Sequence, residues 1–150
     1  EVIPSNRINL PRPMIHQKNY DFSFSGLKTA VLYQVKKMNP LEVKNQKFLQ
    51  AMAAEIQQSI IDVLIHKTIK AVKDYRVKTI ILGGGVTANE ELRKQFKKIC
   101  FSSGFNLFIP SKDLSTDNAA MIAAAGYFRA KKKDFTPWQK LKVDANKELR

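Results

Sequence analysis

The sequence predicts a helix-rich α/β fold with a small, incomplete parallel sheet. An apolar run at 78–82 is followed by a glycine turn and a helical pattern, and a second apolar run follows at 105–109. A strand, helix, strand order of this kind predicts parallel pairing through a right-handed crossover. Because two parallel strands do not form a stable sheet alone, we expect further strands from outside this chain or from a second copy.

Three elements are predicted before the first of these strands. Residues 1–20 hold three of the six prolines and show no periodicity, so we expect an extended N-terminal segment. Phe22 and Phe24 alternate with serines, which predicts a short strand. The apolar spacing then predicts a helix over 27–38, with Asn39 and the following proline ending it.

A long helix is predicted over residues 41–75. Its apolar residues recur every four positions at Phe48, Met52, Ile56, Ile60 and Leu64. Further apolar residues widen this stripe, which is typical of a core helix, since a coiled coil has a narrower seam.

Two more helices follow the glycine turn. Thr87 and Glu90 fit a capping box for a helix that ends before Gly104. The last helix, over 119–132, is rich in alanine, and small side chains permit close approach of another backbone. We divide the chain into the segment 1–20, a main body 21–133 and a basic tail 134–150, in which Phe135 and Trp138 are candidate anchors.

The charge of the chain favours an anionic partner. Twenty-six Lys and Arg oppose thirteen Asp and Glu, which gives a formal charge of +13. Such an excess is typical of nucleic-acid binding, although a solvated basic surface gives the same composition.

The remaining composition indicates a cytoplasmic globular protein. The single cysteine, Cys100, lies among apolar residues, so a buried, inert thiol is expected. No stretch approaches the about 20 apolar residues of a membrane span, and no membrane contact is expected. The chain begins with neither Met nor a signal peptide, which suggests a fragment or a processed product.

The most informative segment is Gly84-Gly85-Val86-Thr87-Ala88-Asn89. Glycines between a strand and a helix let backbone N–H groups approach an anion, and the helix start adds unsatisfied donors. Gly83, Gly85 and Ala88 also satisfy the dinucleotide fingerprint, but the next strand ends without the acid that would hold a ribose. A tight turn without a ligand is the structural alternative.

A second segment places Asp117 before the last helix. An aspartate there is most often an N-cap, and Thr116 could serve in its place. A carboxylate facing a phosphate loop could instead bind a metal ion. The chain cannot complete a metal site by itself, because its two histidines, His16 and His66, lie far apart and form no helical pair.

A third segment, residues 21–30, reads as a strand-to-helix corner. Its Gly-Leu-Lys-Thr string only faintly matches a P-loop, and no His–Asp partnership supports a catalytic serine.

Together these segments resemble the TsaD family, also called Gcp or the glycoprotease family. The matching segments are 21–30, 84–89 with the following Glu91-Leu92-Arg93, and 116–123, and the resemblance extends from Pro11 to about Arg129. The family implies an actin-like ATPase (ASKHA) fold related to ribonuclease H. It also implies transfer of threonylcarbamoyl from threonylcarbamoyl-adenylate to N6 of adenosine 37 in tRNAs that read ANN codons.

The resemblance assigns four site residues and no catalytic residue. Gly84, Gly85 and Asn89 match the motif that contacts the adenylate or another ATP-type nucleotide. Asp117 matches the aspartate that binds one divalent metal ion, iron or zinc. The family's two histidine ligands lie in a His-x-x-x-His motif that is absent here, so the chain resembles a C-terminal portion that should be inactive alone.

The family also implies partners and two alternative functions. The implied partners are tRNA, through lysines such as Lys131, Lys132, Lys133, Lys140 and Lys142, and TsaB-like and TsaE-like proteins. Exposed strand edges favour self-association as a homo-oligomer. The alternatives are a non-catalytic nucleotide-binding scaffold, which usually lacks the metal aspartate, and a metalloprotease, for which no His-Glu-x-x-His motif is present.

Overall fold

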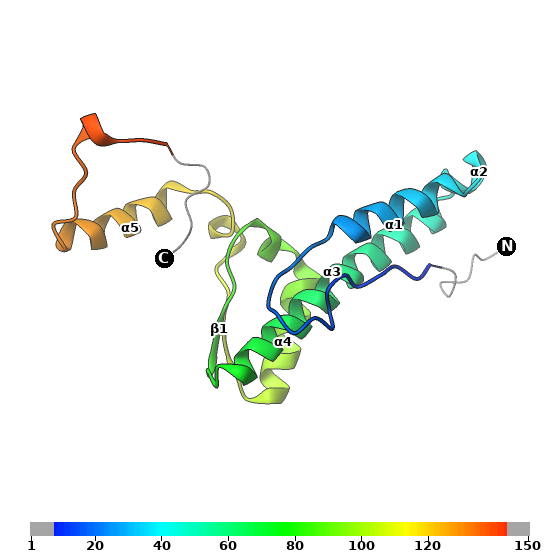
Figure 1. Ribbon diagram of the computed structural model, residues 1–150, viewed down its shortest axis with the longest axis horizontal. Helices are drawn as coiled ribbons and strands as arrows, with labels where there is room; N and C mark the ends of the chain where they lie inside the picture. Colours follow the sequence, from blue (N-terminus) through cyan, green and yellow to red (C-terminus); the bar gives the residue numbers. More distant parts are fainter. Residues whose placement is uncertain (1–7, 144–150) are drawn as a thin grey trace. The chain divides into compact units, whose positions relative to one another are not determined.

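The computed structural model describes residues 8–143. Within that range it holds two strands, β1 (Thr79–Ile81) and β2 (Asn106–Phe108) (Figure 1). The α-helices there are α1 (Ser25–Lys36), α2 (Pro40–Val43), α3 (Gln46–Asp74), α4 (Glu90–Ser103) and α5 (Ala119–Lys131). Short 3-10 turns are η2 (Gly85–Ala88), η3 (Lys112–Leu114) and η4 (Trp138–Lys140).

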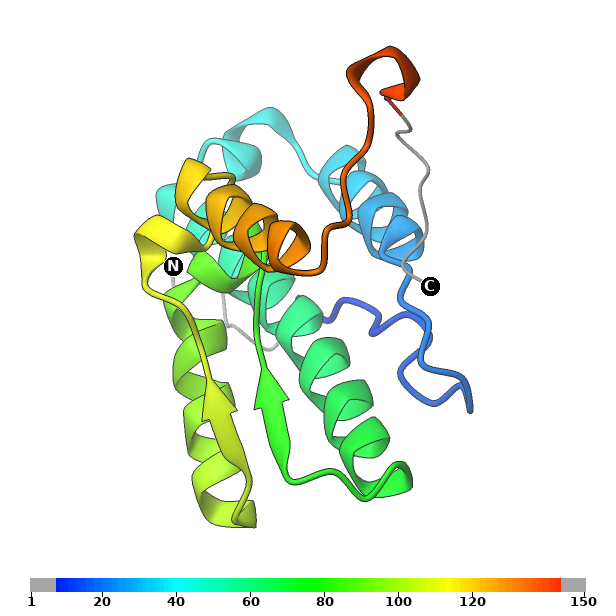
Figure 2. The same cartoon turned by 90° about the vertical axis from the view of Figure 1, so that its left-hand side faces the viewer.

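The two strands form the parallel sheet that the sequence predicts. Ile80 pairs with Leu107 and Ile81 with Phe108, in parallel register. Both α3 and α4 lie on one face of this sheet (Figures 1 and 2). Ile80 is buried, whereas Ile81 and Phe108 are 76% and 62% exposed. One face of the sheet is therefore covered, and the other presents apolar side chains. That further strands complete the sheet stays a prediction.

The helix predicted over 41–75 is two helices. Asn45 interrupts it, because its side-chain oxygen accepts hydrogen bonds from the backbone N–H of Lys47 (2.9 Å) and Phe48 (3.3 Å) and so begins α3. Asn39 caps the short α2 in the same way, within a capping box that Glu42 completes. Apolar spacing alone does not reveal such a break, since the cap depends on the side chain of Asn45 and not on the apolar residues around it.

The strand predicted around Phe22 and Phe24 is wrong. Within residues 8–143 only β1 and β2 pair, and residues 21–24 run into α1 without a strand neighbour. Instead, the carbonyl of Asp21 accepts a hydrogen bond from the ammonium of Lys67 at 2.7 Å. Alternation predicts a strand only where another strand is available to pair with it.

The N-terminal segment packs along α3. Ile8 and Leu10 join Leu27, Phe48 and Met52 in a buried apolar cluster. Beside them the guanidinium of Arg12 forms ion pairs with Glu55 and with Asp62, the latter at 2.9 Å. The hydrogen bond that Arg12 donates to Glu55 is the main cause that raises the pKa of Arg12, and the hydrogen bond to Asp62 adds to it. This pairing fixes the segment on α3 before the chain enters α1.

The chain divides into two compact units. One contains the residues up to Ile81 together with Glu91–Phe108, and the other contains Leu82–Glu90 together with the residues from Ile109 onward. In the first, Cys100 is buried on α4, and burial raises the pKa of its thiol, which confirms the expected buried cysteine. In the second, α5 has no buried residue, and Phe135 and Trp138 are exposed instead of anchoring the tail.

Helix α3 corrects one expectation from the sequence. By length and composition this helix is apolar enough to cross a membrane. Of the apolar stretch of 18 residues that meets this criterion, 28% is buried. The expectation that no stretch approaches a membrane span is therefore wrong for α3. Core helices of soluble proteins meet the same two criteria, so this property alone assigns no membrane location.

Candidate functional site

The glycine turn that follows β1 adopts a conformation open to only a few residue types. Gly84 has φ 85° and ψ 165°, in a region that side chains with a Cβ rarely enter. Apart from the adjacent residues of the chain, no heavy atom among residues 8–143 would lie within 4 Å of a Cβ added at Gly84 or at Gly85. The backbone here is open to an approaching ligand, which fits the role that the sequence predicts for the two glycines.

The turn is closed by its own hydrogen bonds. The backbone N–H and the hydroxyl of Thr87 both donate to the carbonyl of Gly84, at 3.0 and 2.7 Å. Thr87 is buried within η2, so Asn89 and not Thr87 directly precedes α4. The capping box predicted between Thr87 and Glu90 is therefore misplaced, because η2 separates the glycines from the helix.

Asn89 lies half-buried at the end of the turn, with extended backbone angles of φ −63° and ψ 121°. The next residue, Glu90, forms an ion pair with Lys112 of η3. The hydrogen bond from Lys112 lowers the pKa of the exposed Glu90 carboxyl. This contact joins the glycine turn to the segment that leads to Asp117, and both belong to the same compact unit.

Asp117 is exposed and does not cap α5. That position is taken by Asn118, whose side-chain oxygen accepts a hydrogen bond from the backbone N–H of Met121 at 2.9 Å. The amide of Asn118 also donates to the carbonyl of Thr116, at 2.9 Å. The alternative of an N-cap at Asp117 or Thr116 is thus wrong, and the Asp117 carboxylate has no partner among residues 8–143.

The two predicted ligand segments follow neighbouring parallel strands. The glycine turn begins after β1 and the Asp117 segment begins after β2, and Ile81 and Phe108 are paired at the carboxyl ends. In open α/β sheets, ligands bind in the crevice beyond these ends. The topology therefore places Gly84, Gly85, Asn89 and Asp117 on the loops that most often carry a site, and their contact with a ligand stays a prediction.

The structure brings the two histidines together. The ring centroids of His16 and His66 lie 6.0 Å apart, edge to face. The expectation that they lie far apart is wrong because the N-terminal segment folds back along α3. Within residues 8–143 no three His, Cys, Asp or Glu side chains group closely enough to hold a metal ion, so the pair does not complete a centre.

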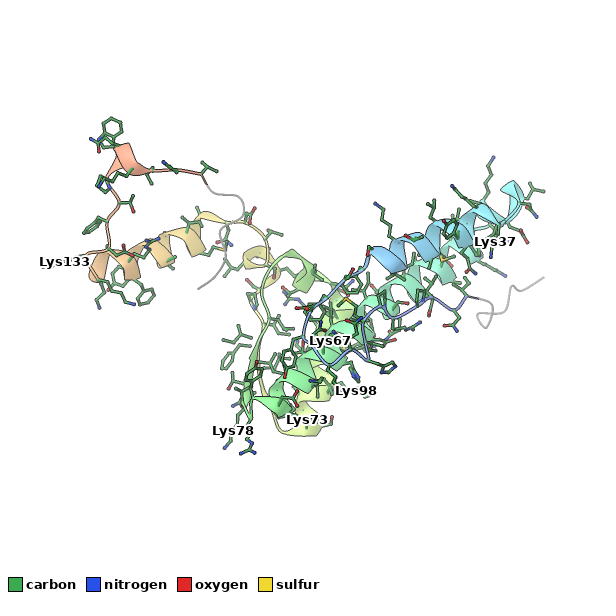
Figure 3. All side chains as sticks on the ribbon, in the orientation of Figure 1. Lys37, Lys67, Lys73, Lys78, Lys98 and Lys133 are labelled. Carbon is green, nitrogen blue, oxygen red and sulfur yellow. The ribbon has the colours of Figure 1, made fainter. Side chains whose placement is uncertain are left out.

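The lysines predicted to contact tRNA are all exposed. The five are Lys131, Lys132, Lys133, Lys140 and Lys142, and Lys133 is labelled in Figure 3. Their exposure permits contact with an anion and equally permits simple solvation. Contact with tRNA stays a prediction.

Comparison with known proteins decides the family. A sequence model described as "TsaD: tRNA N6-adenosine threonylcarbamoyltransferase" matches residues 1–124. The chain belongs to the TsaD family. This finding confirms the resemblance carried by the glycine turn, the Asp117 segment and residues 21–30.

Curated members of the TsaD family that carry this name share much of the sequence. The chain is 48% identical to the protein of Thermosipho africanus over 127 residues, which covers 85% of the chain and 37% of that protein. It is 43% identical to that of Syntrophomonas wolfei, covering 89% of the chain and 38% of the relative. For Staphylococcus saprophyticus the identity is 46%, over 80% of the chain and 34% of the relative. The chain thus spans less than two fifths of the length of these three relatives.

One buried residue that positions segment 21–30 was not predicted from the sequence. Lys67 is 1% exposed, and its ammonium donates to the carbonyl of Asn19 (3.2 Å), the side-chain oxygen of Asn19 (3.1 Å) and the carbonyl of Asp21 (2.7 Å). It holds the start of segment 21–30 on α3. Its only signal is a lysine on the apolar stripe of a predicted core helix, a position where charge is rarely tolerated without partners.

Proposed function

We propose that the protein to which this chain belongs transfers a threonylcarbamoyl group from threonylcarbamoyl-adenylate to N6 of adenosine 37 in tRNAs that read ANN codons. Membership of the TsaD family supports the transferase class, and the relatives are named for this activity. The observation that carries the proposal is the placement of the glycine turn and the Asp117 segment after paired parallel strands and within one compact unit.

Each site residue has a distinct task in this proposal. The open backbone at Gly84 and Gly85 lets N–H groups approach the phosphate of the adenylate without a side chain in the way. The amide of Asn89 hydrogen-bonds the nucleotide and fixes its orientation. Holding the acyl donor in one pose lowers the entropic part of the barrier when the tRNA amine attacks.

The exposed Asp117 fits one ligand position of a divalent metal ion, iron or zinc. Its carboxylate has no hydrogen bond or ion pair among residues 8–143, so no existing contact must break before it binds a cation. One carboxylate does not hold such an ion alone, and the further ligands would come from the rest of the protein. When bound, the ion would act as a Lewis acid that polarises the donor.

The proposal extends to the fold and the partners of the whole protein. A sheet with α3 and α4 on one face fits part of an actin-like ATPase fold, in which further strands would continue the sheet. The exposed lysines from Lys131 to Lys142 would contact tRNA phosphates, and TsaB-like and TsaE-like proteins would be the protein partners. The location proposed for the complex is the cytoplasm.

The test compares Asp117→Asn with Asp113→Asn in the full-length protein that contains this chain. Asp113 is an exposed acid of η3 in the same loop and serves as the matched control. We expect Asp117→Asn to lower transfer of labelled threonylcarbamoyl to tRNA at least about a hundredfold, since loss of a residue that only supports a metal ligand already costs about 10–100-fold. Asp113→Asn should keep wild-type activity.

Metal content and activity of the chain by itself complete this test. The full-length protein should bind one metal ion per chain, and Asp117→Asn should lose it. The chain of 150 residues alone should show neither transfer nor stoichiometric metal binding. Unchanged activity of the Asp117→Asn protein would contradict the proposal and favour a non-catalytic scaffold.

A further inference from the structure

A groove of about 950 Å³ runs between α3 and α4 in the first unit. Its floor is apolar and contains Ile65 and Ile69 from α3, Ile99 from α4 and Ile15 from the N-terminal segment, all half-buried. Ile65 and Ile69 are four residues apart and so lie on the same side of α3. This volume is at the upper end for small-molecule pockets, and because the groove is open to solvent it can also take part of a larger occupant.

Each of the acids that line the groove already has a basic partner. Asp62 pairs with Arg12 at 2.9 Å, Asp74 with Lys70 at 2.5 Å, and Glu91 with Lys94 at 3.8 Å. Each carboxylate therefore has a basic partner from the chain itself. These pairs partly offset the charge of the acids, so the acids repel an anionic occupant less than unpaired carboxylates would.

Two lysines at the rim have no such partner. Lys73 of α3 and Lys98 of α4 both line the groove and are labelled in Figure 3. Neither forms an ion pair with an acid among residues 8–143, and both are exposed. The groove thus combines an apolar floor with two unpaired positive charges on opposite helices.

This combination selects among the possible occupants. Single-stranded nucleic acid binds through aromatic stacking, and among residues 8–143 no Phe, Tyr or Trp side chain lines the groove. A second copy of this chain carries a charge of +13 and would meet the lysines with like charge. An acidic partner with an apolar stripe matches both the apolar floor and the positive charges at the rim.

We propose that the α3–α4 groove binds an amphipathic α-helix of a partner protein, with apolar residues facing the isoleucines and Asp or Glu facing Lys73 and Lys98. The distance along α3 from Ile65 to Lys73 corresponds to about 12 Å, or just over two helical turns. Helix-in-groove recognition uses anchors at i, i+3 or i+4, and i+7, which matches that length. The surface lies outside the loops proposed for transfer, so its test does not depend on that activity.

The experiment measures binding of synthetic helical peptides to this chain by fluorescence anisotropy. The probe is a peptide of about 16 residues with leucines at i, i+4 and i+7 and glutamates flanking them. Two control peptides are compared with it. In one every glutamate is replaced by lysine, and in the other every leucine is replaced by alanine. We expect the acidic probe to bind and both control peptides to bind at least about tenfold more weakly, with the affinity of the probe falling as salt rises.

Charge reversal in the protein identifies the surface. Lys73→Glu and Lys98→Glu should each weaken the acidic probe about threefold to fivefold, the size expected for an exposed ion pair, and together at least about tenfold. Lys97→Glu is the matched control, because Lys97 is exposed on α4 next to Lys98 but does not line the groove. It should leave binding unchanged.

Three results would overturn the proposal. The first is equal binding of the acidic and basic peptides, and the second is an effect of Lys97→Glu as large as that of Lys98→Glu. The third is loss of binding to a tRNA stem-loop or to phosphatidylserine vesicles in Lys73→Glu and Lys98→Glu while peptide binding is unchanged. That last outcome would assign the lysines to nucleic acid or to a lipid surface.

Discussion

At the scale of single residues, Lys67 shows how a buried charge is accommodated in this chain. Ser59, Lys67, Thr87 and Ser115 are the buried polar residues in the part of the chain that the structure describes, and only Lys67 carries a charge. Its ammonium is surrounded by three oxygen acceptors from Asn19 and Asp21. Burial of an ammonium without such partners would cost several kcal/mol, so the contact makes the lysine and residues 19–21 depend on each other.

Substitution of Lys67 should therefore loosen residues 19–24 from α3. We expect Lys67→Met to lower the free energy of unfolding by about 1–3 kcal/mol, because it keeps the apolar stem but leaves the acceptors without a donor. Urea unfolding measures the loss, and amide hydrogen exchange should increase most at residues 19–24. Lys73→Met, at an exposed position on the same helix, is the control. Equal exchange in both variants would contradict this role.

A second contact of the same segment makes stability depend on pH. The hydroxyl of Tyr20 donates to Asp74 at 2.7 Å, and Lys70 pairs with the same carboxylate. The hydrogen bond from Lys70, followed by that from Tyr20, lowers the pKa of Asp74. The hydrogen bond to Asp74 raises the pKa of Tyr20.

The sign of each effect follows from linkage. A lowered carboxyl pKa contributes stability above the ordinary carboxyl pKa of about 3.9, and this contribution is lost as the pH falls through the lowered value. A raised phenol pKa contributes stability below about 10, which is lost as the pH rises through the raised value. Asp74→Asn should therefore shift the titration of one tyrosine to lower pH, as followed by phenolate absorbance. Tyr20→Phe identifies that tyrosine, and an unshifted curve in Asp74→Asn would contradict the assignment.

At the scale of elements, asparagine caps decide where the helices begin. Asn39, Asn45 and Asn118 each accept backbone hydrogen bonds in the first turn of α2, α3 and α5. Apolar periodicity predicted α1 and the bulk of α3, because the buried stripe follows the helical period, whereas α5 was predicted from its alanine content. It missed the break at Asn45 and the cap at Asn118, because several Asn, Asp and Thr residues near a helix start are equally suitable caps.

The candidate site, too, could be predicted only in part from local sequence patterns. The glycine turn could be predicted from its residues, since only glycine readily adopts the φ of 85° observed at Gly84. The parallel pairing of β1 and β2 followed from the strand, helix, strand order. The strand expected at 21–24 was wrong, and the contact of Lys67 with Asn19 and Asp21 was missed, because both depend on contacts more than 40 residues apart in the sequence.

At the scale of the whole molecule, the sheet has an unusual exposed surface. Ile81 and Phe108 are directly paired and both face away from the helices, 76% and 62% exposed. An apolar sheet face in contact with water is costly, and monomeric proteins usually cover it. In the full-length protein another part of the chain would cover this face, whereas in the isolated chain only a second copy is available.

The isolated chain should therefore self-associate through the open face of its sheet. Sedimentation velocity over a range of micromolar concentrations should show a dimer or a larger species, and Phe108→Lys should shift it toward the monomer, since a charge on that face must be desolvated in the contact. Phe101→Lys is the matched control, because Phe101 is 91% exposed on α4 and lies outside the sheet. If Phe101→Lys dissociates the species as effectively as Phe108→Lys, the association depends on general hydrophobicity instead of the sheet. If the wild-type chain is monomeric at every concentration, the exposed pair is tolerated in water and completion of the sheet by a second copy is excluded.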